Sequence, residues 1–382
     1  MTITVREISD SEQWNSFLTS QPRGHLLQSY QWGELNRYLG GRIYRLGALD
    51  DGRMVGALLL SVAQVPLPVS LPGIHLNWLY GSRGPTVEQP GSPALRALLE
   101  QAHVFAHKEH AVVLRLEPNI ADDDLDMNAW LVAYRALGFQ SNPTAIHGRR
   151  SWVLDLRPGA AELLANFKTT WRQNVRSAER KGVVIREAAN DVDFDAYYDL
   201  LKITSERDAF FIHDKEYHRE ILRQFASKGD AVLYLAEHEG EAIAAKMLLR
   251  FGDCCWDMFG ASSNSKRNLK PTYLLQYRCI QWAKSRGCNY FDFRTIPEIL
   301  EPGEEMWGVY EYKKGFGGFS RLNIPTQDYV YRPLAYNAWR SFVELRRARR
   351  HTERKKVELE RAARGKSKSG SPAPTGAVAE EI

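Results

Sequence analysis

The sequence lacks any run of the roughly 18 apolar residues that a membrane-spanning helix needs. Its N-terminal stretch, Met1–Asp10, also lacks the basic segment followed by an apolar segment that marks an export signal. Cysteine is scarce, and the four cysteines form no C-x-x-C pair and have no histidine-rich partner segment. These absences predict a cytoplasmic chain with reduced, structural thiols and no metal site.

The net positive charge of the protein comes from its C-terminal end. The whole chain has a formal net charge of +5. Residues 346–368 contain eleven Lys and Arg against three Glu, and the last fourteen residues carry two Glu, which leaves a net charge of −1 for residues 1–345. We expect residues 343–382 to form a tail that is helical and then disordered. Such a tail fits RNA or the lipid headgroups at the inner face of a membrane, or it is a solvated, solubilising segment.

Three short stretches in the first half return, in the same order, in the second half. A length of 382 residues suits two domains of roughly 150 residues each, so this repetition predicts an internal duplication. The pairs are Asp51–Ala57 with Glu239–Ala245, Trp78–Ser82 with Asp257–Ala261, and 105–116 with 282–293.

Each half has the pattern of a strand, one or two helices, an antiparallel hairpin or meander, a long helix and a further strand. This order predicts an α/β fold with mixed sheets, in the form of two tandem acyltransferase domains of the GNAT type. We expect the first domain in residues 1–150, completed by about 320–342, and the second domain, with the main site, in 151–319. Within the second domain we expect one helix from Ala160 to Lys181.

A coenzyme A site is not supported by the turn that opens the long helix of either half. Coenzyme A pyrophosphate needs backbone N–H groups in a glycine-rich turn, because only glycine lets the backbone approach closely. Ser265–Thr272 contains no glycine, and Glu88–Pro93 contains one glycine and two prolines. The domains therefore either use another acyl donor or hold coenzyme A in an unconventional way.

Four basic residues recur at steps of four along the helical stretch predicted from about Phe167 to Lys181 and fall on one stripe. Like charges at this spacing are mutually unfavourable, which favours a bound anion such as the phosphates of tRNA or of a sugar-linked precursor. The alternative is an exposed basic face with ion-pair partners elsewhere. The residues are Lys168, Arg172, Arg176 and Arg180.

Four passages resemble the Fem-type (FemABX) peptidyltransferases, in particular the compact members without a coiled-coil arm. The resemblance implies transfer of an amino acid from aminoacyl-tRNA to the stem-peptide amine of a lipid- or nucleotide-linked peptidoglycan precursor, by a monomer that needs no cofactor. The passages are Leu27–Leu35, 167–183, 260–262 with the following helix, and Tyr310–Gly318.

The last passage is the most specific, because it resembles the family's aromatic-Lys-x-x-Phe-Gly-Gly segment. The resemblance places Lys313 at the reaction centre and Tyr312 among the substrate-binding residues. An ammonium fixed beside the ester would stabilise the tetrahedral oxyanion more than the ground state. The alternative interpretation is a tight glycine turn with an exposed lysine.

Further positions are carried over from the same resemblance. Glu117 matches an acid-Pro step and is the predicted proton acceptor, the alternative being a shuttle through the ribose hydroxyl of the substrate. Arg207 and Phe211 match an Arg-x-x-x-Tyr pair with which the family binds the precursor, and here the Arg is retained but the Tyr is replaced by Phe211. Phe259 likewise stands where the family commonly has a Tyr, and Asn36 stands where it often has a Lys. The remaining predicted groove residues are Gln28 and Trp32, although a single aromatic residue is more often part of the core. Two other functions stay open: a coenzyme A-dependent N-acetyltransferase, and a non-catalytic RNA- or envelope-binding module.

Overall fold

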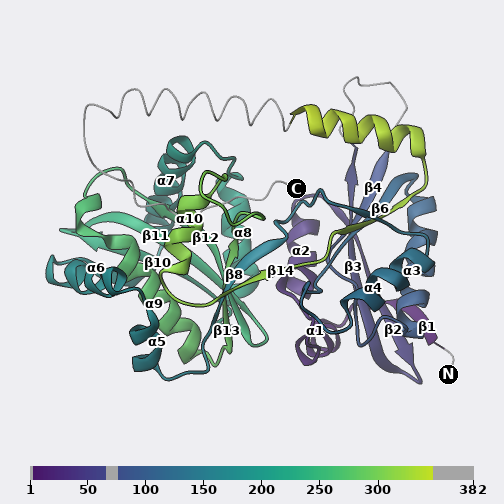
Figure 1. The fold of residues 1–382 in the computed structure, drawn as a ribbon, viewed down its shortest axis with the longest axis horizontal. Helices are drawn as coiled ribbons and strands as arrows, with labels where there is room; N and C mark the ends of the chain where they lie inside the picture. The colour runs from purple at the N-terminus through teal and green to yellow at the C-terminus, as the bar shows by residue number, and fades with distance from the viewer. Residues whose placement is uncertain (1–2, 66–75, 347–382) are drawn as a thin grey trace.

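The computed structural model describes residues 3–65 and 76–346 and contains two domains that lie side by side (Figure 1). The first domain comprises β1 (Ile3–Glu7), α1 (Ser11–Ser20), the 3₁₀ turn η1 (Leu26–Gln28), α2 (Tyr30–Tyr38), β2 (Arg42–Asp50), β3 (Arg53–Gln64), β4 (Asn77–Arg83), β5 (Thr86–Val87), α3 (Pro93–Lys108), β6 (Ala111–Pro118), α4 (Met127–Ala136), β7 (Gln140–Asn142) and β15 (Thr326–Val330). The second comprises β8 (Arg150–Asp155), α5 (Ala160–Asn166), α6 (Thr169–Arg180), β9 (Val184–Glu187), α7 (Asp191–Asp208), α8 (Lys215–Ala226), β10 (Ala231–His238), β11 (Glu241–Phe251), β12 (Cys254–Ser262), the 3₁₀ turn η2 (Arg267–Leu269), α9 (Pro271–Ser285), β13 (Tyr290–Thr295), α10 (Trp307–Lys314) and β14 (Phe319–Leu322).

The two sheets repeat one topology. The first has the order β1-β2-β3-β4-β6-β15-β7, with β5 paired to β3, and the second has the order β14-β8-β13-β12-β11-β10-β9. In the first, β2, β3 and β4 are antiparallel neighbours and β4 then pairs in parallel with β6 after helix α3. In the second, β10, β11 and β12 are antiparallel and β12 pairs in parallel with β13 after helix α9. The predicted α/β fold with two GNAT-like domains is confirmed.

The repeated acidic-Gly pairs form equivalent hairpin turns. Asp51 and Gly52 have φ angles of 46° and 82°, and Glu239 and Gly240 have 55° and 78°. Two consecutive residues with positive φ produce a turn whose twist matches that of the two strands it joins. The same local chemistry therefore builds β2-β3 and β10-β11.

The prediction of one helix from Ala160 to Lys181 is wrong, because the chain breaks it into α5 and α6. Phe167 and Lys168 are extended, with ψ angles of 145° and 136°. This break places the Phe167 ring in the core, where it is 2% exposed, and lets the Lys168 N–H donate to the Gly315 carbonyl at 2.8 Å. Burial of a phenylalanine and a tertiary hydrogen bond thus outweigh continuation of the helix.

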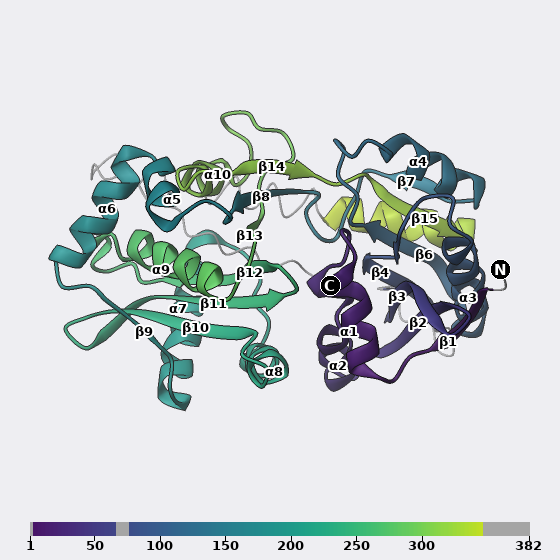
Figure 2. The ribbon, with the colours of Figure 1, turned by 90° about the horizontal axis from the view of Figure 1, so that it is seen from below.

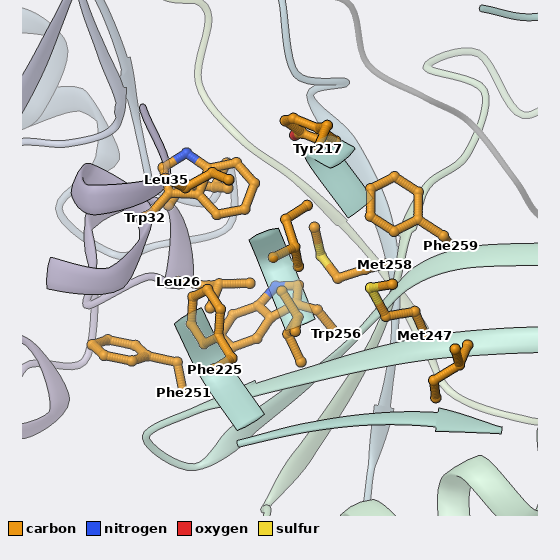
Figure 3. Close-up of a cluster of buried hydrophobic side chains, with 14 of the residues drawn as sticks. Leu26, Trp32, Leu35, Tyr217, Phe225, Met247, Phe251, Trp256, Met258 and Phe259 are labelled. Carbon is orange, nitrogen blue, oxygen red and sulfur yellow. The ribbon is translucent and has the colours of Figure 1, made fainter. Parts of the chain in front are cut away.

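The domains share one hydrophobic core. Helices α1 and α2 lie on the side of the first sheet that faces the second domain (Figure 2). Their buried side chains pack against α7, α8 and strands β10–β12, and Figure 3 shows Leu26 and Trp32 on the first-domain side, with Phe225 and Trp256 among the second-domain side chains of this cluster. A shared core of this kind fixes the relative position of the two sheets.

The chain crosses from the second domain back to the first near residue 323. Strand β14 pairs with β8 in the second sheet, whereas β15 inserts between β6 and β7 in the first. A helix over 333–346 then packs Tyr336 and Trp339 against Trp78. The predicted tail beyond residue 346 lies outside the described residues. None of the described helices is long and apolar enough to cross a bilayer.

All four cysteines carry free thiols, as predicted. Burial is the main cause that raises the thiol pKa of each of them. A thiol with a raised pKa is a poor nucleophile, so these residues are part of the packing.

Candidate active site

Lys313 is buried in the second domain. Its side chain is on α10, is 2% exposed, and donates from Nζ to the Thr295 carbonyl at 2.7 Å. Burial lowers the pKa of Lys313 to about 7, while the nearby Asp257 raises it. A lysine with this pKa is an ammonium below neutral pH and exchanges its proton near neutrality.

The glycines after Lys313 let α10 lie close to its neighbours. A Cβ on Gly315 would overlap the Trp171 ring of α6. Gly317 and Gly318 have φ angles of 82° and 102°, and a Cβ on Gly318 would lie well inside van der Waals contact of the Val153 carbonyl oxygen on β8. The glycines therefore hold the lysine helix against α6 and the sheet.

The strands beside Lys313 separate at their ends. β12 and β13 pair in parallel from Cys254 and Tyr290 only as far as Trp256 and Asp292. Beyond this point Arg294 has a left-handed backbone with φ of 65°, and its Nη1 donates to the Met258 carbonyl at 3.1 Å. Arg294, to which the sequence assigned no role, thus spans the opening between the two strands.

A buried ion pair lies in the same region and was missed by the sequence analysis. Lys246 on β11 and Asp257 on β12 form a close salt bridge, with side chains 5% and 2% exposed. The Asp257 Oδ1 is buried without a hydrogen bond to any described residue. The charge of this buried carboxylate acts on Lys313 and raises the pKa of the lysine, which favours the ammonium form.

A cavity of about 590 Å³ lies between the domains. Its walls come from both domains and include Thr295, whose carbonyl accepts the Lys313 hydrogen bond. Polar side chains in the walls include His25, Arg83, His147, Asp292, Arg294 and Arg321. Lys313 itself thus lies behind the cavity wall at the end of β13 and is joined to that wall through Thr295.

Glu117 and Asp292, two of the several carboxylates in or beside the cavity, differ in their hydrogen bonds. Glu117, the predicted proton acceptor, accepts from the Tyr80 hydroxyl at 2.6 Å and from the Ile146 and His147 N–H groups at 2.5 and 3.1 Å. Asp292 lines the cavity, one of its oxygens accepts from the Arg294 N–H at 2.6 Å, and burial raises its pKa. Glu117 holds two segments together, whereas Asp292 borders open space.

The predicted groove residues of the first domain form a separate group. Gln28 is fully buried, and its amide donates to the Leu59 and Ser82 carbonyls at 3.1 and 2.7 Å. Trp32 and Asn36 line a small depression that shares Leu27 and His147 with the large cavity. Trp32 and Asn36 therefore lie next to the cavity, and Gln28 fixes the wall behind them.

The predicted groove residues of the second domain are spread over its surface and core. Arg207 donates to the Ser262 carbonyl at the end of β12 at 2.9 Å, and Phe211 is 53% exposed. Phe259 and Tyr312 are buried in packed cores, and the Tyr312 hydroxyl donates to the Thr272 carbonyl at 2.8 Å. Of these four, Arg207 and Phe211 have surface on which a ligand can bind in this conformation.

The basic stripe lies next to the lysine helix. The Trp171 Nε1 on α6 donates to the Tyr312 carbonyl on α10 at 3.0 Å. None of the four stripe residues forms an ion pair with a carboxylate in the described part of the chain. Arg172 is held by the Ala165 carbonyl and by Thr169, whereas Arg176 and Arg180 are exposed. The stripe thus keeps its charge available to an external anion.

Comparison with known proteins gives consistent matches over most of the chain. The profile of the FemAB family matches residues 9–241 and 236–343. The lipid II:glycine glycyltransferase of Staphylococcus aureus is 24% identical over 398 residues, which cover 85% of this chain and 93% of that protein. The crystal structure of FemX matches with a TM-score of 0.78 at 22% identity, over 88% of this chain and 99% of the other. A conserved protein of unknown function from Bacteroides thetaiotaomicron matches with a TM-score of 0.54 at 12% identity, over 86% and 99%.

Proposed function

The chain belongs to the FemAB family, and from that premise we propose that it is an aminoacyltransferase of peptidoglycan synthesis. It takes an aminoacyl group from a charged tRNA and passes it to the stem-peptide amine of a lipid- or nucleotide-linked precursor, as in the formation of interpeptide bridges. The observation that carries this proposal is the buried Lys313, whose Nζ bonds to a residue of the interdomain cavity wall. Charged tRNA is found in the cytoplasm, so the proposal also assigns the chain to that compartment.

In the proposed reaction the acceptor amine lies in the cavity and the donor ester lies at the opening between β12 and β13. Attack forms the new C–N bond and a tetrahedral oxyanion, and collapse of this intermediate breaks the C–O bond to the tRNA ribose. The Lys313 ammonium stabilises the oxyanion more than the ester carbonyl, and a group in this role typically contributes about 3 kcal/mol.

The amine loses a proton during the transfer, and the departing ribose oxygen gains one. Asp292 suits the role of proton acceptor, because it borders the cavity and burial raises its pKa towards the working range. Glu117 stays a prediction for this role, since its oxygens are already occupied by Tyr80 and by two backbone N–H groups. A direct shuttle through the adjacent ribose hydroxyl is the alternative route.

The basic stripe is proposed to bind the phosphates of the donor tRNA. Reversing the charges of Arg176 and Arg180 to Glu is expected to raise the KM for charged tRNA at least about tenfold at low salt, with little change in kcat. The matched control is Arg6→Glu with Arg53→Glu, which makes the same charge change at exposed positions of the first sheet. Equal KM values for charged tRNA in the two double variants would show that the basic residues of α6 do not bind the tRNA.

The function itself is tested by supplying a pool of charged tRNAs and a nucleotide-linked precursor and examining the precursor by mass spectrometry. The proposal expects a product heavier by one amino-acid residue that disappears when the tRNA is deacylated. A product that instead appears with acetyl-coenzyme A would identify an N-acetyltransferase. Tight RNA binding without any product under either condition would identify a binding module.

A further inference from the structure

Arg321 supplies a positive charge in the wall of the interdomain cavity that the proposed reaction does not use. Strand β14 places Phe319 and Arg321 two residues apart, and both side chains line the cavity. By contrast, Arg83 and Arg294 are held in place by backbone carbonyls, those of Gly148 and Met258. Within residues 3–65 and 76–346, the guanidinium of Arg321 forms no hydrogen bond and no ion pair, although the residue is only partly exposed and its backbone pairs with Ser151 of β8. A partly buried guanidinium without a partner favours an anionic ligand.

His25 provides a neutral hydrogen-bond donor in the same cavity. Its Nδ1 accepts the Leu27 N–H at 3.0 Å, so the proton of the neutral ring is on Nε2. Burial, together with the nearby charge of Arg83, lowers the pKa of His25 well below its usual value and keeps the ring neutral. The ring is fixed against Trp256 of the second domain, with centroids 5.1 Å apart. His25 therefore offers an oriented N–H to an anion held by Arg321.

Asp292 adds a negative charge to this arrangement. It lines the cavity, and the charge of Arg321 acts on both Asp292 and His25. Asp292 forms no ion pair with Arg321, and only one of its oxygens has a hydrogen bond from the described residues. A cation and an anion that stay apart in one cavity suit a ligand that carries both charges itself.

We propose that Arg321, His25 and Asp292 form a subsite for an aminocarboxylate, in which Arg321 and His25 bind the carboxylate and Asp292 holds the amine on the same carbon atom. The inference rests on the proposed function for the role of that amine as the acceptor. It assigns the acceptor to the class of diamino-dicarboxylic acids, whose reactive side chain ends in an amine and a carboxylate together. A plain alkylamine such as lysine would leave Arg321 unpaired when the ligand fills the cavity.

The experiment compares two nucleotide-linked precursors that differ only at the amine-bearing residue, which is meso-diaminopimelate in one and L-lysine in the other. Titration calorimetry on the full chain is expected to show about 10- to 100-fold tighter binding of the diaminopimelate precursor, as a charge-assisted hydrogen-bond pair predicts. Arg321→Gln is expected to abolish this preference and to leave the affinity for the lysine precursor unchanged. Arg53→Gln serves as the control, because it removes an exposed charge from the first sheet. This variant is expected to keep the full preference for the diaminopimelate precursor.

Equal affinities of the unmodified protein for the two precursors would overturn the subsite. The subsite would also be overturned if Arg321→Gln lowered the binding affinity for both precursors by the same factor, because that result would indicate a structural role for Arg321. Binding does not require transfer, so the two proposals fail separately. Clear discrimination without any aminoacyl product would retain the subsite and refute the proposed function.

Discussion

Replacement of Lys313 by methionine is expected to lower kcat for aminoacyl transfer by a factor of about 10² to 10³. Methionine keeps the length and volume of the side chain but cannot donate to an oxyanion. The KM for each substrate should change little, since the interaction is made mainly in the transition state. The matched control is Lys314→Met: Lys314 is the exposed neighbour on the same helix, and its loss should leave kcat unchanged. Near-normal kcat in the Lys313→Met variant would show that Lys313 does not stabilise the transition state.

The same substitution is expected to stabilise the protein at low pH. The pKa of Lys313 is about 7 in the folded protein and about 10.5 in an unfolded chain. Because the unfolded state binds more protons between these values, stability rises with pH from 7 to 10.5, and the cost of burying the ammonium is complete below pH 7. Removing it should raise the free energy of unfolding by about 2 kcal/mol at pH 6, after allowing for the unsatisfied Thr295 carbonyl.

This stability prediction is checked by thermal unfolding of both proteins between pH 6 and pH 10. The difference between variant and parent should shrink steadily as pH rises towards 10, because the parent then buries a neutral amine. A constant difference over this range would mean that the Lys313 pKa is not depressed in the folded state. A gain in stability together with a loss of turnover is typical of a residue that serves chemistry at the expense of folding.

The duplicated fold could be predicted from the sequence because local chemistry specifies its turns. Asp51-Gly52 and Glu239-Gly240 adopt the same positive φ angles, and each lies between apolar strands. A two-residue hairpin of this kind depends on the two turn residues and their flanking strands alone. The membership of the FemAB family was likewise evident from short motifs such as Tyr310–Gly318, and it is confirmed.

The broken helix could not be predicted in this way. The residues from Ala160 to Lys181 are compatible with one continuous helix, and the break at Phe167 depends on a hydrogen bond between Lys168 and Gly315, which are far apart in the sequence. Local propensity contributes only tenths of a kcal/mol per residue, whereas burial of a phenylalanine contributes about 2 kcal/mol. Tertiary contacts therefore decide where such helices end.

The polar residues around Lys313 were missed for a related reason. Lys246 and Asp257 are each a single charged residue inside an apolar run, and no local pattern shows that β11 and β12 pair in a register that brings the two charges together. In the folded protein helices cover both faces of this sheet, and the two charges are buried as an ion pair. His25 and Arg321 are separated by almost the whole chain, and only the packing of the two domains brings them to one cavity.

Substitution of Gly318 by alanine is expected to lower the free energy of unfolding by about 2 to 6 kcal/mol. Part of this loss, about 1 to 3 kcal/mol, comes from forcing a residue with a side chain into a φ angle of 102°. The rest, about 1 to 3 kcal/mol, comes from overpacking, because the new Cβ would press on the Val153 backbone of β8, which cannot move without disturbing the sheet. The measurement is calorimetric unfolding of the variant and the parent protein.

Gly303→Ala separates these two contributions. Gly303 has a φ angle of 100°, nearly that of Gly318, but a Cβ at Gly303 meets no atom within 4 Å. This variant should therefore lose only the backbone part of the free energy and keep normal transfer activity. Gly318→Ala should in addition lower kcat, since a shift of the segment between β14 and α10 moves Lys313 away from the end of β13. Equal losses of stability in the two variants would mean that close packing on Val153 contributes nothing, and the tight fit that positions the lysine helix would then lack support.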